Sequence, residues 1–160
     1  MQLVVSDTSP LVALSRSGLL GFLPTLYQTV LIPPSVLAEL ASHVDVREVE
    51  RFVFVRAPRV TAGRVLRPSQ LDQGEWDAIQ LALEVHADAV LIDESARRAY
   101  AQQQSLSVVG FLGILLIAKR VGRVASIGHV VRQLMADHKY FVGAQLLRKV
   151  LQTAGEVESS

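Results

Sequence analysis

The chain has 160 residues, half of them apolar, with no cysteine and a formal net charge of +1. This composition supports one domain with one core and excludes a dependence on disulfides or thiolate chemistry. The first residues lack the basic region of a signal peptide, and the longest apolar run, Val108 to Ala118, is too short to cross a bilayer. We therefore expect a cytoplasmic protein without a membrane segment, with a single domain over residues 1–155 and a frayed tail over residues 156–160.

The charges are distributed unevenly along the chain. Residues 1–96 carry 7 Lys or Arg against 12 Asp or Glu, whereas residues 97–160 carry 9 against 3. An acidic part followed by a basic part suggests a site for cations beside a surface for anions. Within the acidic part, four arginines follow one another without an intervening acid, and they form either a solvated loop or a strip that contacts a phosphate backbone. These arginines are Arg56, Arg59, Arg64 and Arg67.

Short runs of apolar, β-branched residues alternate with segments of helical periodicity. We expect strands at residues 3–5, 29–32, 52–55, 89–92 and 107–109. The predicted helices are 11–14, 19–27 with breaks near Gly18 and Pro24, 35–41, 47–51, 75–86 with Asp72 as its cap, 94–104, 112–121, 127–137 and 143–154, and residues 59–68 are expected to form a loop or irregular strand. Strands separated by helices predict right-handed crossovers, and therefore a three-layer α/β/α fold around a central parallel sheet of four to five strands.

Two acids come at the ends of predicted strands. Asp7 ends the run that begins at Leu3, and Asp93 directly follows the strand at 89–92. In an open α/β sheet, ligands bind in the crevice outside the carboxyl ends of the strands, so both acids are candidates for a binding site. Asp7 has an alternative role as a helix N-cap, because two hydroxyl residues and a proline follow it.

Two further acids lie on predicted helices among apolar neighbours. Glu39 follows a proline pair on an apolar helical turn, which is unusual for a carboxylate unless it faces a polar cavity. On a helical wheel, Glu75 falls on the apolar side of its helix, while Asp77 and Glu84 fall on the opposite side, which we expect to be solvated. Two alternatives remain: Glu75 as a first-turn carboxylate that complements the helix dipole, and Asp77 as the third acid if the helix is kinked.

The predicted arrangement places no lysine or histidine among the four acids, which are Asp7, Glu39, Glu75 and Asp93. Carboxylates that converge in this way repel one another, and some hold protons unless a cation balances them. Mg²⁺ and Mn²⁺ take oxygen ligands and leave coordination positions open for water and a phosphate oxygen. Such an ion lowers the pKa of a bound water and stabilises charge that develops on phosphorus. The acids therefore favour metal-dependent phosphodiester hydrolysis.

Short motifs occur along nearly the whole chain: VSDTS at 5–9, IPPSVLAEL at 32–40, GE at 74–75 with AL at 82–83, ADAVLID at 87–93, and FLG at 111–113 leading into AKR at 118–120. Together they resemble the PIN-domain proteins of the VapC-like ribonuclease toxin group, in particular a branch of small PIN-like proteins first described as a family of unknown function. The resemblance implies that Asp7, Glu39, Glu75 and Asp93 form the metal site and are catalytic, and that Ser9 supports Asp7. It also implies Mg²⁺- or Mn²⁺-dependent cleavage of RNA, a homodimer, and a small antitoxin that covers the site.

Two positions depart from the pattern of that family. The third acid is Glu75 where most members have Asp, and Leu91 stands where a Thr is usual, so a supporting hydroxyl is missing. These departures leave open an alternative, a catalytically weak PIN-like module that binds RNA or a protein partner. A phospho-acceptor domain on a similar sheet is disfavoured, because Gly110 and Phe111 occupy the place where that chemistry usually requires a lysine.

Two arginines, Arg97 and Arg98, come one helical turn after Asp93, at a helix start that phosphate would approach. We expect either that they contact RNA or that they form an exposed helix face. Arg56 and Arg59 are further candidates for contacts with the RNA backbone.

Overall fold

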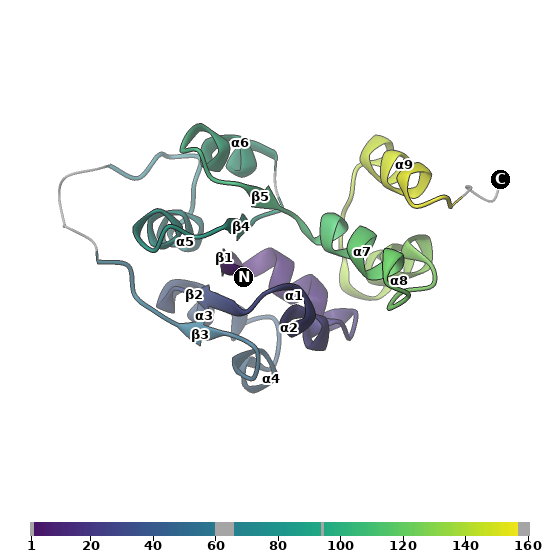
Figure 1. Ribbon diagram of the computed structural model, residues 1–160, viewed down its shortest axis with the longest axis horizontal. Helices are drawn as coiled ribbons and strands as arrows, with labels where there is room; N and C mark the ends of the chain where they lie inside the picture. Colours follow the sequence, from purple (N-terminus) through teal and green to yellow (C-terminus); the bar gives the residue numbers. More distant parts are fainter. Residues whose placement is uncertain (1, 60–65, 94, 157–160) are drawn as a thin grey trace. The chain divides into compact units, whose positions relative to one another are not determined.

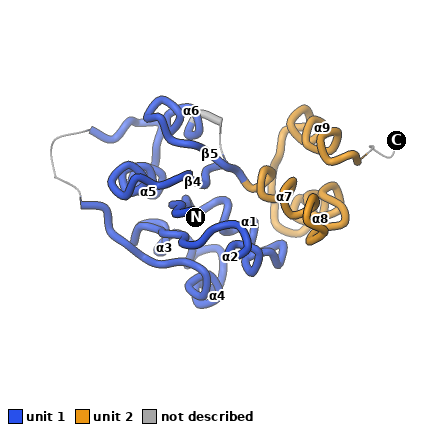
Figure 2. Tube along the Cα trace, viewed as in Figure 1, with its two compact units in different colours: residues 1–110 blue, residues 111–160 orange. Residues whose placement is uncertain are grey.

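The computed structural model describes residues 2–59, 66–93 and 95–156. The chain divides into two compact units, residues 1–110 and residues 111–160 (Figure 2). The strands of the described chain all belong to the first unit. Residues 60–65, most of the stretch predicted as a loop or irregular strand, lie outside the described residues, and Arg64 lies among them.

The first unit is built on a five-stranded parallel sheet, which confirms the predicted fold class. β1 (Leu3–Ser6) lies at the centre, with β2 (Thr29–Ile32) and β3 (Phe54–Val55) on one side and β4 (Ala89–Leu91) and β5 (Val108–Val109) on the other. In Figure 1 the strands follow one another from top to bottom as β5, β4, β1, β2 and β3. The third strand is shorter than predicted, because pairing with β2 begins only at Phe54.

The central position of β1 follows from its sequence. Val4 and Val5 are fully buried, and Val5 pairs with Leu31 of β2 and with Val90 of β4. A parallel strand that is covered on both faces requires such a continuous run of β-branched residues rather than a polar and apolar alternation. Because all strands run in the same direction, Ser6 and the residues that follow it lie at the carboxyl edge of the sheet.

Helices lie on both sides of this sheet. The first helix begins at Thr8 and extends beyond the predicted range 11–14 at both ends; its first turn holds the hydroxyl residues and the proline that follow Asp7, as the tolerance of a first turn for these residues predicts. The predicted break near Pro24 is present, because a 3-10 helix ends at Phe22 and a separate short helix begins at Leu23, with Pro24 in its first turn. The helices of this unit are α1 (Thr8–Arg16), the 3-10 helix η1 (Leu20–Phe22), α2 (Leu23–Leu26), α3 (Pro34–Leu40), α4 (Val46–Glu50), α5 (Gln73–Glu84) and α6 (Ser95–Gln103).

One buried hydrophobic cluster of the first unit joins α5 to the sheet. Trp76 and Ile79 of α5 are buried in one cluster with Val5 of β1, Val90 of β4 and Ala101 of α6. Full burial of a large aliphatic side chain such as that of Ile79 contributes about 1.5–3 kcal/mol to the stability of the fold, because apolar surface is removed from water. The packing confirms the apolar side that periodicity predicts for α5, and it fixes the start of this helix against the edge of the sheet.

The second unit consists of α7 (Phe111–Arg120), α8 (Ile127–His138) and α9 (Ala144–Thr153). α7 contacts both other helices. The rings of Phe111 and Tyr140 pack edge to face, with centroids 5.8 Å apart. In the part of the chain that the structure describes, no helix is both long and apolar enough to span a membrane.

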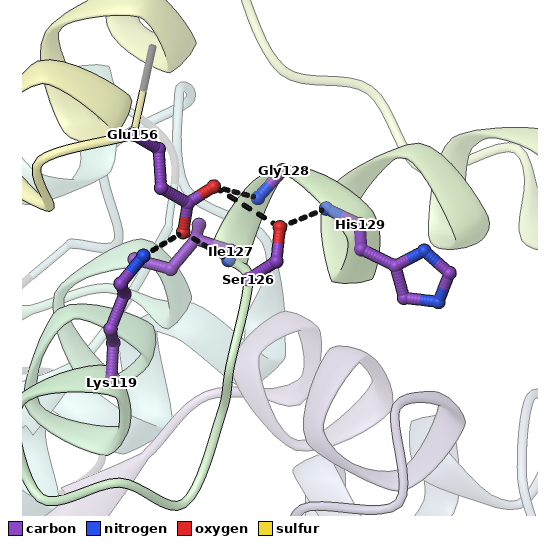
Figure 3. A network of polar contacts seen from close by, with 6 residues as sticks. All are labelled: Lys119, Ser126, Ile127, Gly128, His129 and Glu156. Carbon is purple, nitrogen blue, oxygen red and sulfur yellow. Dashed lines mark hydrogen bonds and ion pairs between the residues drawn. The ribbon is translucent and has the colours of Figure 1, made fainter.

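Glu156, where a frayed tail was predicted to begin, is bound to the helices of the second unit. Its carboxylate accepts hydrogen bonds from Lys119 Nζ at 2.7 Å and from the backbone N–H groups of Ile127 at 2.5 Å and Gly128 at 3.0 Å (Figure 3). Ser126 Oγ donates a further bond at 3.2 Å. Burial acts to raise the pKa of Glu156, but these donors outweigh it and lower the pKa to about 2. Residues 157–160 lie outside the described residues.

Candidate metal centre

The strand order produces a switch point between β1 and β4, because the chain adds strands on one side of β1 first and then on the other. Ligands bind outside the carboxyl ends of the strands at such a point. Asp7 directly follows β1, and its backbone N–H donates to the carbonyl oxygen of Leu91 in β4 at 3.0 Å. Asp93 comes shortly after the end of β4. The two acids predicted from strand ends therefore lie at the same edge of the sheet.

Three carboxylates from different elements meet at this edge. They belong to Asp7 before α1, Glu39 near the end of α3, and Asp72 before α5, and one oxygen of each lies within 4.8 Å of the others. α3 packs against both α1 and α5, which brings together acids that are far apart in the sequence. Asp7 is only 3% exposed, whereas Glu39 and Asp72 are in contact with solvent. The group is therefore closed at Asp7 and open at the other two acids.

Thr8 and Gly74, two small residues, lie next to these carboxylates and affect how closely they approach one another. Thr8 Oγ1 donates a hydrogen bond of 2.9 Å to Glu39 Oε2, which connects the start of α1 to α3. A Cβ atom on Gly74 would lie 3.0 Å from Glu39 Oε2 and 3.5 Å from Asp72 Oδ1. Real Cβ contacts are rarely this short, so the glycine leaves the space that the two carboxylates occupy.

Glu75 is held beside this group by a capping box at the start of α5. Its N–H donates to Asp72 Oδ1 at 2.8 Å, and its Oε2 accepts from the N–H of Asp72 at 2.9 Å. Its other oxygen, Oε1, forms an ion pair with Arg97 Nε at 2.5 Å. Glu75 is 1% exposed, so the prediction that it points inward from the first turn of its helix is confirmed.

The two buried acids, Asp7 and Glu75, both have raised pKa values. Burial raises the pKa of Asp7 to about 7 from its ordinary value of 3.8, and the charges of Glu75, Asp72 and Glu39 act in the same direction against a hydrogen bond from the Thr8 backbone. Burial also raises the pKa of Glu75 to about 7, although the Asp72 backbone and Arg97 oppose the shift. A cation beside Asp7 would favour its carboxylate form and remove the mutual repulsion.

The donor set fits a hard divalent cation. Asp7, Glu39 and Asp72 offer oxygen ligands, which Mg²⁺ and Mn²⁺ prefer over nitrogen or sulfur. Mg²⁺ is usually bound by one or two carboxylates and keeps several water molecules, and the solvent-exposed side of this group leaves room for them. Exposed acidic groups are common without an ion, so the burial of Asp7 is the feature that favours one here.

Asp93 lies at the same sheet edge but does not belong to the three carboxylates within 4.8 Å. A Cβ atom on Gly110, which follows β5, would lie 3.1 Å from Asp93 Oδ1 and 2.9 Å from Arg98 Nη1. Asp93 and Arg98 are therefore neighbours over the ends of β4 and β5. Of the four predicted acids, the structure brings Asp7 and Glu39 into one group, places Glu75 beside it through Asp72, and places Asp93 next to an arginine.

Asp77 and Glu84 pair with other groups of the protein, so the prediction that they form a solvated face of α5 is wrong for these two acids. Asp77 accepts a hydrogen bond from Ser35 Oγ at 2.6 Å, which ties α5 to α3, and one from Gln73 Nε2 within α5 at 2.7 Å. Glu84 accepts the N–H of Arg59 at 2.7 Å, and one of its oxygens lies 3.8 Å from Arg59 Nε and 4.0 Å from Arg56 Nη2. Both acids pair with groups of neighbouring segments because their helix packs beside those segments, which a wheel of one helix cannot represent.

The sequence predicts only a capping role for Asp72, and the family resemblance implies that the hydroxyl of Ser9 supports Asp7. In the structure Ser9 is exposed, and the hydroxyl of Thr8 is the one that contacts Glu39. The proximity of Asp72 to Glu39 depends on the packing of α3 against α5. A usable signal was nevertheless present, because Asp72 and Glu75 have the spacing of a capping box, which places the two carboxylates side by side.

Comparisons with known proteins agree with this fold. A family model described as a PIN domain matches residues 3–156. A PilT N-terminus domain protein from the hyperthermophilic archaeon Sulfolobus solfataricus P2 has a similar structure, with a TM-score of 0.50 and 18% sequence identity over 68% of this chain and 87% of that chain. At this identity the likeness supports the fold alone, and no curated protein sequence matches the chain. The family model covers both compact units and the acids at the switch point, and the chain therefore belongs to the PIN-domain family.

Proposed function

We propose that the protein is an endoribonuclease that hydrolyses RNA phosphodiester bonds with Mg²⁺ or Mn²⁺. PIN domains are generally nucleases and typically use divalent metal ions. The observation that carries the proposal for this chain is the meeting of the Asp7, Glu39 and Asp72 carboxylates at the switch point of the sheet. Burial of an acid among other acids opposes its charged form, and a bound cation would favour that form.

The four acids implied by the family resemblance have different roles in this proposal. Asp7 and Glu39 would hold the ion, because their oxygens already approach one another. When bound, the ion would lower the pKa of a water molecule and stabilise the charge that develops on phosphorus. Glu75 or Asp93 would orient or activate the attacking water. A pKa near 7 for Glu75 suits a group that exchanges protons at neutral pH.

The arginines near these acids would position the RNA. Arg97 contacts Glu75, and Arg98 lies beside Asp93, so both are close enough to the acids to bind a phosphate next to the reacting bond. The side chains of Arg56 and Arg59 are 48% and 86% exposed and would contact the RNA backbone further away. Glu84 lies close to both arginines, so its negative charge would weaken their attraction for the RNA backbone.

The resemblance to the VapC-like group supports a more specific role. In this role the protein is a cytoplasmic toxin, acts as a homodimer, and is inhibited by a small antitoxin that covers the acids. A short reading frame immediately upstream of the gene would support this pairing, and mapping of cleavage sites on total RNA would identify the target.

The direct test is the substitution Asp7→Asn. It removes the most buried carboxylate of the group, and we expect it to abolish RNA cleavage stimulated by Mg²⁺ or Mn²⁺ as well as any growth arrest on expression. The matched control is Asp45→Asn at the exposed N-cap of α4, where asparagine caps as well as aspartate. Cleavage is measured on RNA over a range of metal concentrations. An Asp7→Asn variant as active as the parent would show that the assignment is wrong.

A binding module without turnover is the second candidate. It is favoured by Leu91, which is fully buried and supplies no hydroxyl, and by Glu75, whose two oxygens are both engaged. Calorimetric titration with metal, combined with cleavage assays, separates the two functions. The binding module predicts little heat on addition of metal and no cleavage at any metal concentration.

A further inference from the structure

We infer that Asp72 is a ligand of the divalent ion, a position that the family resemblance gives to Glu75. This inference rests on the proposed function, because it concerns the same ion. It begins from the capping box of α5, in which the two acids contact each other but differ in what their remaining oxygens do.

The carboxylate of Asp72 is available to an ion. Asp72 Oδ1 accepts the N–H of Glu75 at 2.8 Å, and an oxygen of the same carboxylate lies within 4.8 Å of oxygens of Asp7 and Glu39. An ionised carboxylate has about four lone-pair sites, so one capping bond leaves capacity for a cation. Asp72 is exposed, so a hydrated ion can reach it from solvent.

The carboxylate of Glu75 is already engaged at both oxygens. Oε2 accepts the N–H of Asp72 at 2.9 Å, and Oε1 is paired with Arg97 Nε at 2.5 Å. The residue is 1% exposed. To bind the ion, Glu75 would have to give up the end of the capping box and an ion pair, whereas Asp72 would give up neither. With respect to the ion, Glu75 is then a positioning residue, which fixes the backbone of Asp72 and through it the direction of the Asp72 carboxylate; its proposed role at the attacking water is separate.

The position of Gly74 also supports Asp72, rather than Glu75, as the ligand of the ion. The same absent Cβ atom would lie 3.0 Å from Glu39 Oε2 and 3.5 Å from Asp72 Oδ1. The Glu39 and Asp72 carboxylates therefore approach one point on the backbone of α5, directly before Glu75. Asp7 completes the group from α1, so the ion would have one ligand from each of three helix-bearing segments.

The test measures Mn²⁺ binding by calorimetry on the full-length protein, with thermal unfolding without metal as the check of folding. The variants are Asp72→Asn and Asp72→Ser, because asparagine and serine are good N-caps and preserve α5. The matched control is Asp77→Asn, which removes one negative charge from the same helix. Both oxygens of Asp77 are engaged by Ser35 and Gln73, so it has no expected role in metal binding.

We expect both Asp72 variants to bind Mn²⁺ at least about tenfold more weakly than the parent, and Asp77→Asn to stay within about twofold of it. Glu75→Gln should weaken binding less than Asp72→Asn, because a positioning residue acts through the ligand. Addition of Mn²⁺ should also raise the unfolding temperature of the parent more than that of the Asp72 variants.

Other outcomes overturn the inference in distinguishable ways. If Asp72→Asn and Asp72→Ser bind Mn²⁺ like the parent while Asp7→Asn does not, Asp72 is not a ligand but the proposed function stands. If Asp72→Asn and Asp77→Asn lose affinity equally, general charge rather than ligation is responsible. If the parent itself binds no Mn²⁺, both the inference and the proposed function fail.

Discussion

Asp7 in the first unit precedes the start of α1, and Glu156 in the second unit follows α9 and binds the start of α8 through its carboxylate. The surroundings of these two acids are opposite. Burial raises the pKa of Asp7 to about 7, with support from three neighbouring acids. The donors around Glu156, namely Lys119 and two backbone N–H groups, lower its pKa to about 2 despite burial. A carboxylate whose charge is balanced by donors inside the protein, such as that of Glu156, keeps its charged form without a further partner. A carboxyl group surrounded by other acids, such as that of Asp7, holds a proton near neutral pH unless a cation balances its charge.

The largest effect on stability is expected from Glu156→Ala, which removes the carboxylate that is balanced by donors inside the protein. The change leaves the N–H groups of Ile127 and Gly128 and the ammonium group of Lys119 without their common acceptor. Hydrogen bonds to charged groups are worth about 1.5–3 kcal/mol, so we expect a loss of about 2–3 kcal/mol in the free energy of unfolding. Denaturant unfolding measures it.

The control for that change is Asp137→Ala, which removes an exposed acid from α8. It should leave the free energy of unfolding within about 0.5 kcal/mol of the parent. If Glu156→Ala also falls within that range, the network in Figure 3 does not stabilise the second unit.

The pH dependence sharpens the same comparison. The pKa of Glu156 is about 2 in the folded state against an ordinary value of 4.5, so the charged form stabilises the fold. This stabilisation is complete above pH 4.5 and is lost as the pH falls towards 2. Between the parent and Glu156→Gln, the difference in unfolding free energy should shrink by roughly 1–3 kcal/mol from pH 6 to pH 2.5. A difference that stays constant over this interval would mean that Glu156 is not held as a balanced carboxylate.

The smallest effect is expected from Gly74→Ala in the unbalanced group. The new methyl group would contact Glu39 Oε2 at 3.0 Å, and the flexible end of that side chain can move away by a few tenths of an ångström. Alanine favours a helix over glycine by about 1 kcal/mol, and this gain offsets the cost of displacing the Glu39 side chain. The free energy of unfolding should therefore change little. We expect Mn²⁺ affinity to fall by about tenfold or less. Calorimetry and thermal unfolding on one preparation separate the two effects, and an unchanged affinity would show that Gly74 does not set the spacing of the carboxylates.

The parts of the fold that depend on local sequence were predictable. The apolar run at Val4 and Val5 predicted a buried strand, and the position of Asp7 after it predicted that this acid lies at the carboxyl edge of the sheet. The inward direction of Glu75 followed from helical periodicity, because packing against the sheet requires the apolar side of α5 to face it. These predictions needed no knowledge of other segments.

The partners of individual side chains were not predictable in the same way. Asp72 has the sequence signature of a helix cap, and its second neighbour Glu39 comes from a helix more than thirty residues earlier in the chain. Glu156 lies in a polar stretch that indicates a frayed end, yet the start of α8 supplies N–H groups that bind it. In both cases the contact arises from packing between helices, which residue patterns within one segment do not contain.

The central claim is that the carboxylates of Asp7 and Glu39, with Asp72, hold one divalent cation. Its most direct test is a crystal structure of the protein grown with Mn²⁺, with the anomalous scattering of manganese used to locate the ion. We expect an anomalous peak within coordination distance of oxygens of Asp7, Glu39 and Asp72. Well-ordered crystals at saturating Mn²⁺ that show no peak beside Asp7 would contradict it.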